Sequence, residues 1–319
     1  MSQSVEAFRN AFKIPELKRR IIFTVIMLAV YRLGAHIPTP GVNGQRLAAV
    51  LRESGGGLLS FYDMFTGGAF ENATIFALGI MPYISASIIM QLLVAVVPFL
   101  EKLHKEGAEG QKKITEYTRY GTIALCIVQS LGVSFWLAGL SGRGGEPIVS
   151  HTGLMFYFLC ILSFTTGTAF IMWLGEQITE KGIGNGISLI IFAGIVCRGP
   201  EAIINTFRLL ASGEMGIFFI LILIAMMVLI VGIIVYVESG QRRIPVQYAK
   251  RVIGRKMYGG QSTHLPLKVN TAGVIPPIFA SSIIMFPATI ANFVSHPWMN
   301  MVAEYLMPGR LFYELLYVA

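Results

Sequence analysis

Two segments of the chain carry the same apolar motif: GIMPYISASII at residues 79–89 and GVIPPIFASSI at residues 273–283. Glycine, proline and serine coincide at matching positions, together with the commoner isoleucine and alanine. The copies lie in the second and seventh apolar runs of the chain, so they would cross a membrane in opposite directions. This arrangement predicts an inverted repeat, with a functional site where the two halves meet. The alternative is a chance likeness between two apolar helices.

The composition is typical of a membrane protein. Of the 319 residues, 54% are hydrophobic and 13% are charged, whereas soluble domains have about 25% charged residues. A soluble protein so poor in charge would expose large apolar patches and aggregate. The composition therefore argues against an ordinary soluble enzyme, and also against a disordered chain. Nucleic-acid binding, anionic lipids or cytoplasmic loops would each explain the formal net charge of +8.

Seven apolar runs reach or approach the roughly 20 residues that a helix needs to cross a bilayer. They are Ile21–Leu33, Ile75–Phe99, Gly121–Leu140, Leu154–Leu174, Ile187–Cys197, Ile217–Val237 and Val274–Val294. An eighth run, Leu311–Ala319, is too short to cross. We therefore predict an all-α polytopic membrane protein with seven complete transmembrane helices and the start of an eighth. The first run has no cleavage pattern of a signal peptide.

Lysine and arginine gather in the connections on one side of these spans. Most lie before the first span, around residues 102–119, and in a loop at about 238–271. Because cytoplasmic loops are enriched in Lys and Arg, this bias places the N-terminus in the cytoplasm. Before the first span, Phe8 and Phe12 alternate with Arg9 and Lys13. That pattern predicts an amphipathic helix on the inner membrane surface.

Residues 55–74 fit neither a span nor a solvated loop. Three glycines precede the apolar residues 58–65, and Gly67 and Gly68 follow them. The stretch is too short to cross the bilayer and too apolar for water, which favours a re-entrant half-helix buried in protein. An amphipathic turn at the membrane surface is the alternative. Glycines at both ends would let the piece move as a unit.

Both copies of the motif combine a proline with small and branched side chains. Pro82 and Pro276 weaken the helix and favour a bend. The small residues around Ser85–Ser87 and 280–282 allow close helix contact in lipid, where each hydrogen bond adds only about 0.6 kcal/mol. The branched residues of each copy fit ordinary lipid-facing surface, or an apolar constriction that excludes water from a pore.

Other motifs do not support an enzyme or a metal site. The glycine-rich stretch 182–186 lacks the preceding strand and the lysine of a nucleotide loop. The five histidines are scattered and have no metal-ligand spacing. The centres of the spans hold Gln91 and Gln129 but essentially no charged residue, which argues against a proton-coupled pump. We expect no cofactor, no metal and no catalytic residue. A secondary transporter with inverted repeats stays as the alternative to a passive channel.

Several longer motifs resemble the bacterial SecY family, the main subunit of the protein-conducting channel. They are the motif at 79–88, YTRYG at 117–121, MWLGEQITEKGIGNGI at 172–187, GQRRIPV at 240–246 and QSTHLPLKVN at 261–270. The resemblance covers nearly the whole chain. It implies two inverted halves of five helices, here residues 1–199 and an incomplete 200–319, because the chain ends early in the family's eighth helix.

The resemblance also implies four groups of functional residues. A hydrophobic pore ring would comprise Ile80, Ile84, Ile187, Ile191 and Ile278. A plug at about residues 58–72 would include Phe61, Asp63, Met64, Phe65, Gly67, Gly68 and Asn72. A lateral gate, through which apolar segments leave into lipid, would include Ser85, Ser87, Ile88, Ser281 and Ser282. Partner docking on the basic loop would use Arg242, Arg243, Lys250, Arg251, Arg255 and Lys256. Alternatively, the loop is basic only because cytoplasmic loops of membrane proteins are enriched in Lys and Arg.

The family's partners follow from the same resemblance. They are the SecE and SecG subunits, the SecA motor, the ribosome, nascent secretory and membrane polypeptides, and anionic lipids. The implied localisation is the cytoplasmic (inner) membrane, with several spans and a cytoplasmic N-terminus. The channel itself would be passive, and a motor ATPase or the translating ribosome would supply the energy.

Overall fold

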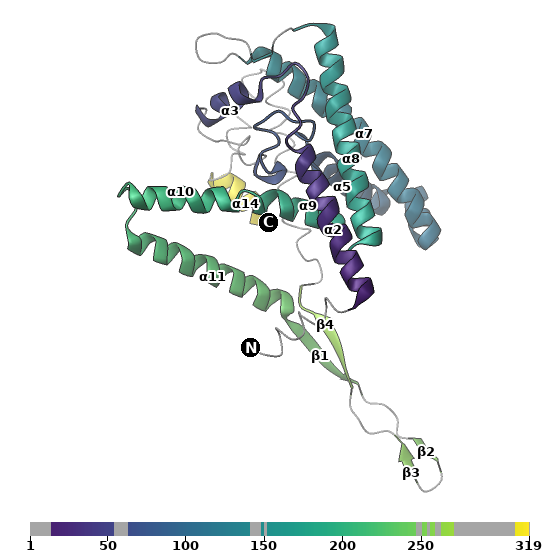
Figure 1. Cartoon of the computed structure of the whole chain (residues 1–319). Coiled ribbons are helices and arrows are strands. Elements are labelled where there is room, and N and C mark those ends of the chain that lie inside the picture. The colour runs from purple at the N-terminus through teal and green to yellow at the C-terminus, as the bar shows by residue number, and fades with distance from the viewer. Residues whose placement is uncertain are drawn as a thin grey trace. The chain divides into compact units, whose positions relative to one another are not determined.

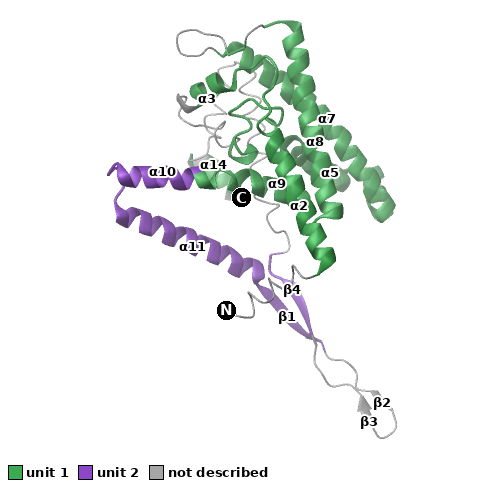
Figure 2. Cartoon of the chain, in the orientation of Figure 1, with its two compact units in different colours: residues 1–200, 279–319 green, residues 201–278 purple. Residues whose placement is uncertain are grey.

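The computed structural model describes residues 14–53, 63–140, 148–149, 152–246, 251–253, 256–258, 263–270 and 310–318. The chain divides into two compact units (Figure 2). Residues 1–200 and 279–319 form the first unit, and residues 201–278 form the second. Each unit is described by itself.

The first unit is a bundle of helices (Figure 1). Its helices are α2 (Pro15–Gly34), α3 (Gly44–Glu53), α5 (Met81–Val96), α6 (Pro98–Lys105), α7 (Ala108–Gly139), α8 (Leu154–Lys181), α9 (Gly186–Val196) and α14 (Leu311–Val318). Within it α8 packs against α7, α9 and α2, and α5 packs against α7. The second unit contains α11 (Ile217–Ser239), most of α10 (Gly199–Ala211) and four short strands.

The helices agree with the predicted spans in part. Four stretches among the described residues are long and apolar enough to cross a membrane: Ala108–Gly139, Leu154–Lys181, Gly186–Ala211 and Ile217–Ser239. The bent pair α5 and α6 raises that number to five if it counts as one span. The predicted span Val274–Val294 lies outside the described residues. Seven complete transmembrane helices therefore stay a prediction.

The second predicted span is shorter than expected. The chain runs in turns over residues 75–80, and α5 begins only at Met81. Gly79 has φ +56°, which a helix cannot accommodate, and Pro82 lies in the first turn of α5, where its missing N–H costs nothing. At the other end, Val97 is extended, as residues before proline prefer, and α6 departs at 97°.

Glycines bring parts of the first unit into close contact. The ring of Phe76 lies against Gly34 of α2, at a place that a Cβ atom would occupy, and the Ile75 carbonyl lies in the same way against Gly167 of α8. Larger residues at these glycines would push Phe76 out of the bundle. A buried apolar cluster lies next to this contact: Leu47, Phe70, Ala73, Ala77, Leu78, Leu137, Ile148, Val149, Phe156, Cys160 and Phe164.

Helices α2 and α9 contact each other. In the middle of α2, Thr24 accepts a hydrogen bond from the Ile183 N–H (3.2 Å), three residues before α9 begins. Near their C-termini, a Cβ atom on Gly194 of α9 would lie 3.4 Å from the Tyr31 hydroxyl oxygen of α2.

The all-α prediction is wrong in the basic loop. Strand β1 (Gln241–Val246) pairs antiparallel with β4 (Thr263–Lys268), and β2 (Arg251–Ile253) pairs with β3 (Lys256–Tyr258). Pro245 lies opposite His264, and Pro266 lies opposite Arg243. Both prolines therefore belong to pairs of residues that are not hydrogen-bonded to each other. There the N–H points away from the partner strand, so a proline breaks no hydrogen bond of the ladder.

Candidate functional site

Residues 63–80 are mostly buried in the first unit, and we call them the buried segment. They form one helical turn at residues 63–66 and continue in turns to Ile80. A long half-helix is therefore absent from the described part of the predicted plug, whose residues 58–62, including Phe61, lie outside the described residues. Gly67 and Gly68 have φ of +66° and +88°, which only glycine adopts at little cost. These angles turn the chain out of the helix.

Two acidic side chains of the buried segment pair with one arginine after α9. Arg198 Nη1 lies 2.8 Å from Asp63 Oδ2, and Arg198 Nη2 lies 2.8 Å from Glu71 Oε2. The side chains of Asp63 and Glu71 are 5% and 11% exposed, and that of Arg198 is 34% exposed. Asp63 Oδ1 also accepts a hydrogen bond from the Glu71 N–H (2.8 Å).

Burial raises the pKa of the Asp63 carboxyl above its usual value. The Glu71 N–H and Arg198 act in the opposite direction. The loss of hydration disfavours the charged carboxylate, and its hydrogen bond and ion pair offset that effect only in part, as is common for buried ion pairs. The ion pair is therefore better evidence for the position of the segment than for its stability.

Helix α2 contacts the same part of the segment. Arg32 donates a hydrogen bond from Nη1 to the Gly67 carbonyl (2.8 Å). A Cβ atom on Gly67 would lie 2.7 Å from the Gly194 carbonyl and 3.0 Å from Cys197 Sγ, both on or next to α9. The backbone at Gly67 thus passes between the C-terminal ends of α2 and α9, where a larger residue does not fit.

The described isoleucines of the predicted pore ring lie at the start of α5 and on α9. Ile80 and Ile84 are buried near the start of α5, one turn apart. Ile187 and Ile191 are half-buried on α9, and Ile187 contacts α8 at Gly175. Ile190, which the sequence does not single out, is almost fully buried there as well. Ile278 lies outside the described residues.

The residues predicted for the lateral gate lie on α5 in the described half. Ile88 is buried, whereas Ser85 and Ser87 are half-buried. Ser87 accepts a hydrogen bond from Gln91 Nε2 (3.3 Å). Ser87 and Gln91 line a cavity of about 320 Å³, together with Gln111 and Thr115 of α7. Ser281 and Ser282 lie outside the described residues.

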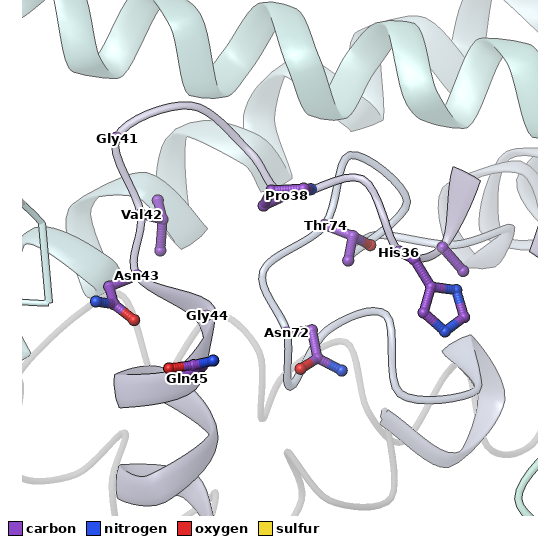
Figure 3. A pocket seen from close by; sticks show the side chains of 10 residues that line it. His36, Pro38, Gly41, Val42, Asn43, Gly44, Gln45, Asn72 and Thr74 are labelled. Carbon is purple, nitrogen blue, oxygen red and sulfur yellow. The ribbon is translucent and has the colours of Figure 1, made fainter. Parts of the chain in front are cut away.

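A second cavity, of about 580 Å³, lies next to the middle of the buried segment (Figure 3). Asn72 and Thr74 form one side, and His36 follows α2. The side chain of Asn43 lies by the start of α3, where it accepts a hydrogen bond from the Arg46 N–H (3.2 Å). The sequence gives no sign of this cavity, because its lining comes from turns rather than from a periodic element.

Several basic residues of the loop lie on its short strands. Arg242 and Arg243 are exposed on β1. Arg251 and Lys256 lie on β2 and β3, while Lys250 and Arg255 fall outside the described residues. Side chains alternate between the faces of a strand, so Arg242, Ile244 and Leu267 share one face, and Arg243 lies on the other with His264 and Lys268.

The SecY family model matches residues 74–319. The chain belongs to the SecY family. The protein translocase subunit SecY of Escherichia coli (strain K12) is 52% identical over 309 residues, covering 95% of this chain and 69% of the relative. SecY of Aquifex aeolicus is 46% identical over 314 residues, which cover 98% of this chain and 73% of the relative.

Solved structures show the same fold. A protein-conducting channel matches with a TM-score of 0.64 at 23% identity, over 89% of this chain and 62% of that one. Sec61 from a canine ribosome–channel complex matches with a TM-score of 0.62 at 22% identity, over 89% of this chain and 63% of that one. The chain thus spans less than two thirds of these structures. Membership of the SecY family confirms the predicted resemblance and does not favour the secondary transporter.

Among the described residues, no three His, Cys, Asp or Glu side chains lie close enough together to hold a metal ion. The structure instead brings together two features that the SecY resemblance predicts separately, the plug residues Asp63 and Gly67 and the fifth span. Arg198, which joins them, was not predicted.

Proposed function

We propose that the chain is the central subunit of a channel that passes unfolded secretory polypeptides across the cytoplasmic membrane and releases hydrophobic segments sideways into the bilayer. The observation that carries this proposal is the buried segment, held between the C-terminal ends of α2 and α9 in a member of the SecY family. A related solved structure concerns a plug domain that stabilises the closed channel. We infer the same role for residues 58–72 here.

The apolar residues of α5 suit the proposed pore ring. A channel for many sequences cannot rely on specific contacts, whereas a ring of isoleucines is deformable and excludes water and ions by dewetting. Ile80 and Ile84, with Ile187, Ile191 and Ile278, would form that ring. Segments then partition between pore and lipid. At a helix centre, Leu or Ile gains about 0.3–0.6 kcal/mol, and Asp, Lys or Arg costs about 2.5–3.5 kcal/mol.

The lateral gate would open along α5. The small faces at Ser85 and Ser87, opposite Ser281 and Ser282, would form a seam that closes without strong bonds, because hydrogen bonds between membrane helices contribute little. Ile88 would keep the closed seam apolar. The seam and the ring would lie between the two inverted halves, residues 1–199 and the incomplete 200–319.

The channel would be passive and depend on partners. We propose that SecE, SecG and anionic lipids surround it in the inner membrane, with the N-terminus in the cytoplasm. Related channels have been solved bound to ribosomes. The SecA motor or the ribosome would dock on Arg242, Arg243, Lys250, Arg251, Arg255 and Lys256, and nascent secretory and membrane polypeptides would enter from there.

A reconstituted transport assay tests this function. Vesicles with the protein and its partner subunits, supplied with motor and ATP, should protect a secretory precursor from added protease. Replacing both Arg242 and Arg243 by Gln should reduce protection several-fold. It should also weaken ribosome binding. The slope of log affinity against log salt concentration should become shallower by roughly one for each RNA phosphate that the loop no longer binds.

Arg208→Gln on α10 is the matched control, because the charge bias places Arg208 on the opposite side of the membrane. We expect this variant to transport like the unaltered protein. If the unaltered protein protects no precursor, the proposed function is wrong. If Arg208→Gln impairs transport as much as the double variant, the docking role of the basic loop is wrong.

A further inference from the structure

One arginine joins two acidic groups across the fold. Arg198 follows α9, and Glu71 lies 127 residues earlier in the sequence. The guanidinium reaches Asp63 with one nitrogen and Glu71 with the other, each at 2.8 Å. A planar guanidinium suits such a two-armed contact, whereas a lysine ammonium would bind as a single point charge.

This cation pairs with both carboxylates. Both side chains are almost fully buried, and both belong to a turn that the Asp63–Glu71 hydrogen bond closes. Without Arg198, two negative charges would lie close together in a poorly hydrated site, which is strongly unfavourable. Arg32 cannot replace it where it stands, because it donates to the Gly67 carbonyl rather than to a carboxylate.

We propose that Arg198 is the residue that positions the plug. Its ion pairs with Asp63 and Glu71, which we call the ionic latch, hold residues 63–72 against the end of α9. The segment leaves only when the guanidinium exchanges both carboxylates for water or another anion. This inference rests on the proposed function insofar as residues 63–72 act as the plug. The position of the segment and the conductance of the channel are therefore measured separately.

Cys197 provides a natural reporter of the segment's position. Cys197 is half-buried, and its Sγ lies 3.7 Å from the Gly67 carbonyl, so departure of the segment would expose the thiol further. The other two cysteines, Cys126 and Cys160, are buried among helices. Labelling by a membrane-impermeant maleimide, with Cys197→Ser as the blank, reports exposure. Removing a neighbouring cation lowers thiolate reactivity, so faster labelling after loss of Arg198 indicates uncovering.

The test compares four variants with the unaltered full-length protein, in membranes with its partner subunits. Arg198→Met should label at Cys197 at least about tenfold faster, because breaking a buried ion pair is strongly destabilising. Arg198→Lys should lie between Arg198→Met and the unaltered protein. Adding Asp63→Asn and Glu71→Gln to Arg198→Met should restore slow labelling, because neutral amides do not need the cation. Arg208→Met on α10 is the control and should change nothing.

Two outcomes overturn the inference. One is labelling of Arg198→Met at the unaltered rate. The other is fast labelling that the two amide substitutions do not reverse, because Arg198 would then act by packing alone. If Arg198→Met does not accumulate, Asp63→Asn with Glu71→Gln and Arg198 intact replaces it. This double variant should label several-fold faster, and an unchanged rate would contradict the ionic latch.

Resting ion conductance separates the ionic latch from the plug. If Arg198→Met labels faster and also conducts more ions, both the latch and the plug role are supported. If it labels faster while conductance stays unchanged, the latch is supported and the plug role under the proposed function fails. If labelling stays slow, the latch fails whatever the conductance.

Discussion

Replacing Ile84 by Ser should raise the resting ion conductance of the channel by roughly tenfold or more. Ile84 is 8% exposed at the start of α5, where we propose the pore ring. A tenfold change in rate corresponds to about 1.4 kcal/mol of barrier, less than the roughly 1.5–3 kcal/mol that one buried isoleucine side chain contributes. A hydroxyl at that place would also bind water and end the dewetting. Planar-bilayer recordings of the full-length protein measure the conductance.

The matched control lies on the same helix. Ile89 is 45% exposed, so Ile89→Ser should leave the resting conductance unchanged. Equal conductance of Ile84→Ser and the unaltered protein would contradict the role of Ile84 as part of the water seal. Equal increases in both variants would show a general loosening of α5 instead.

Replacing Phe164 by Ala should lower the free energy of unfolding by about 3–5 kcal/mol. Phe164 of α8 has no exposed surface and belongs to the apolar cluster beside the buried segment. Its removal would leave a cavity that the surrounding helices only partly close. Unfolding of the purified protein in detergent, followed by circular dichroism, measures the loss.

Phe158→Ala is the control for this change. Phe158 lies on the same helix but is 61% exposed, so its truncation removes little packing and should cost far less. A similar loss in the two variants would contradict the described position of the cluster. The comparison also tests which face of α8 lies inside the bundle.

Periodicity and length were enough to predict most of the helices. Apolar runs of sufficient length predicted the regions of α2, α7, α8, α9 and α11, because lipid requires every backbone group to be paired within the helix. The start of α5 was wrong by six residues, from Ile75 to Met81. Residues 75–80 are apolar because they are buried in protein, and hydropathy alone does not separate that environment from lipid.

The strands of the basic loop and the ionic latch could not be predicted in this way. Charged residues and prolines argue against strands inside a sheet, yet a two-stranded ribbon has open edges that accept both Pro245 and Pro266. Arg198 directly follows the predicted fifth span, and no motif in the sequence marks it. Its pairing with Asp63 and Glu71 depends on how α9 packs against the buried segment, and no spacing in the sequence encodes that distance.

Crosslinking of a secretory polypeptide stalled in transit tests the central claim most directly. Single cysteines would replace Ile84 and Ile278, with the native cysteines removed, and Leu162→Cys on the exposed face of α8 would serve as control. We predict that the stalled chain crosslinks to positions 84 and 278 and not to position 162. Crosslinks at position 162 without any at 84 or 278 would contradict a polypeptide path through the centre of the protein.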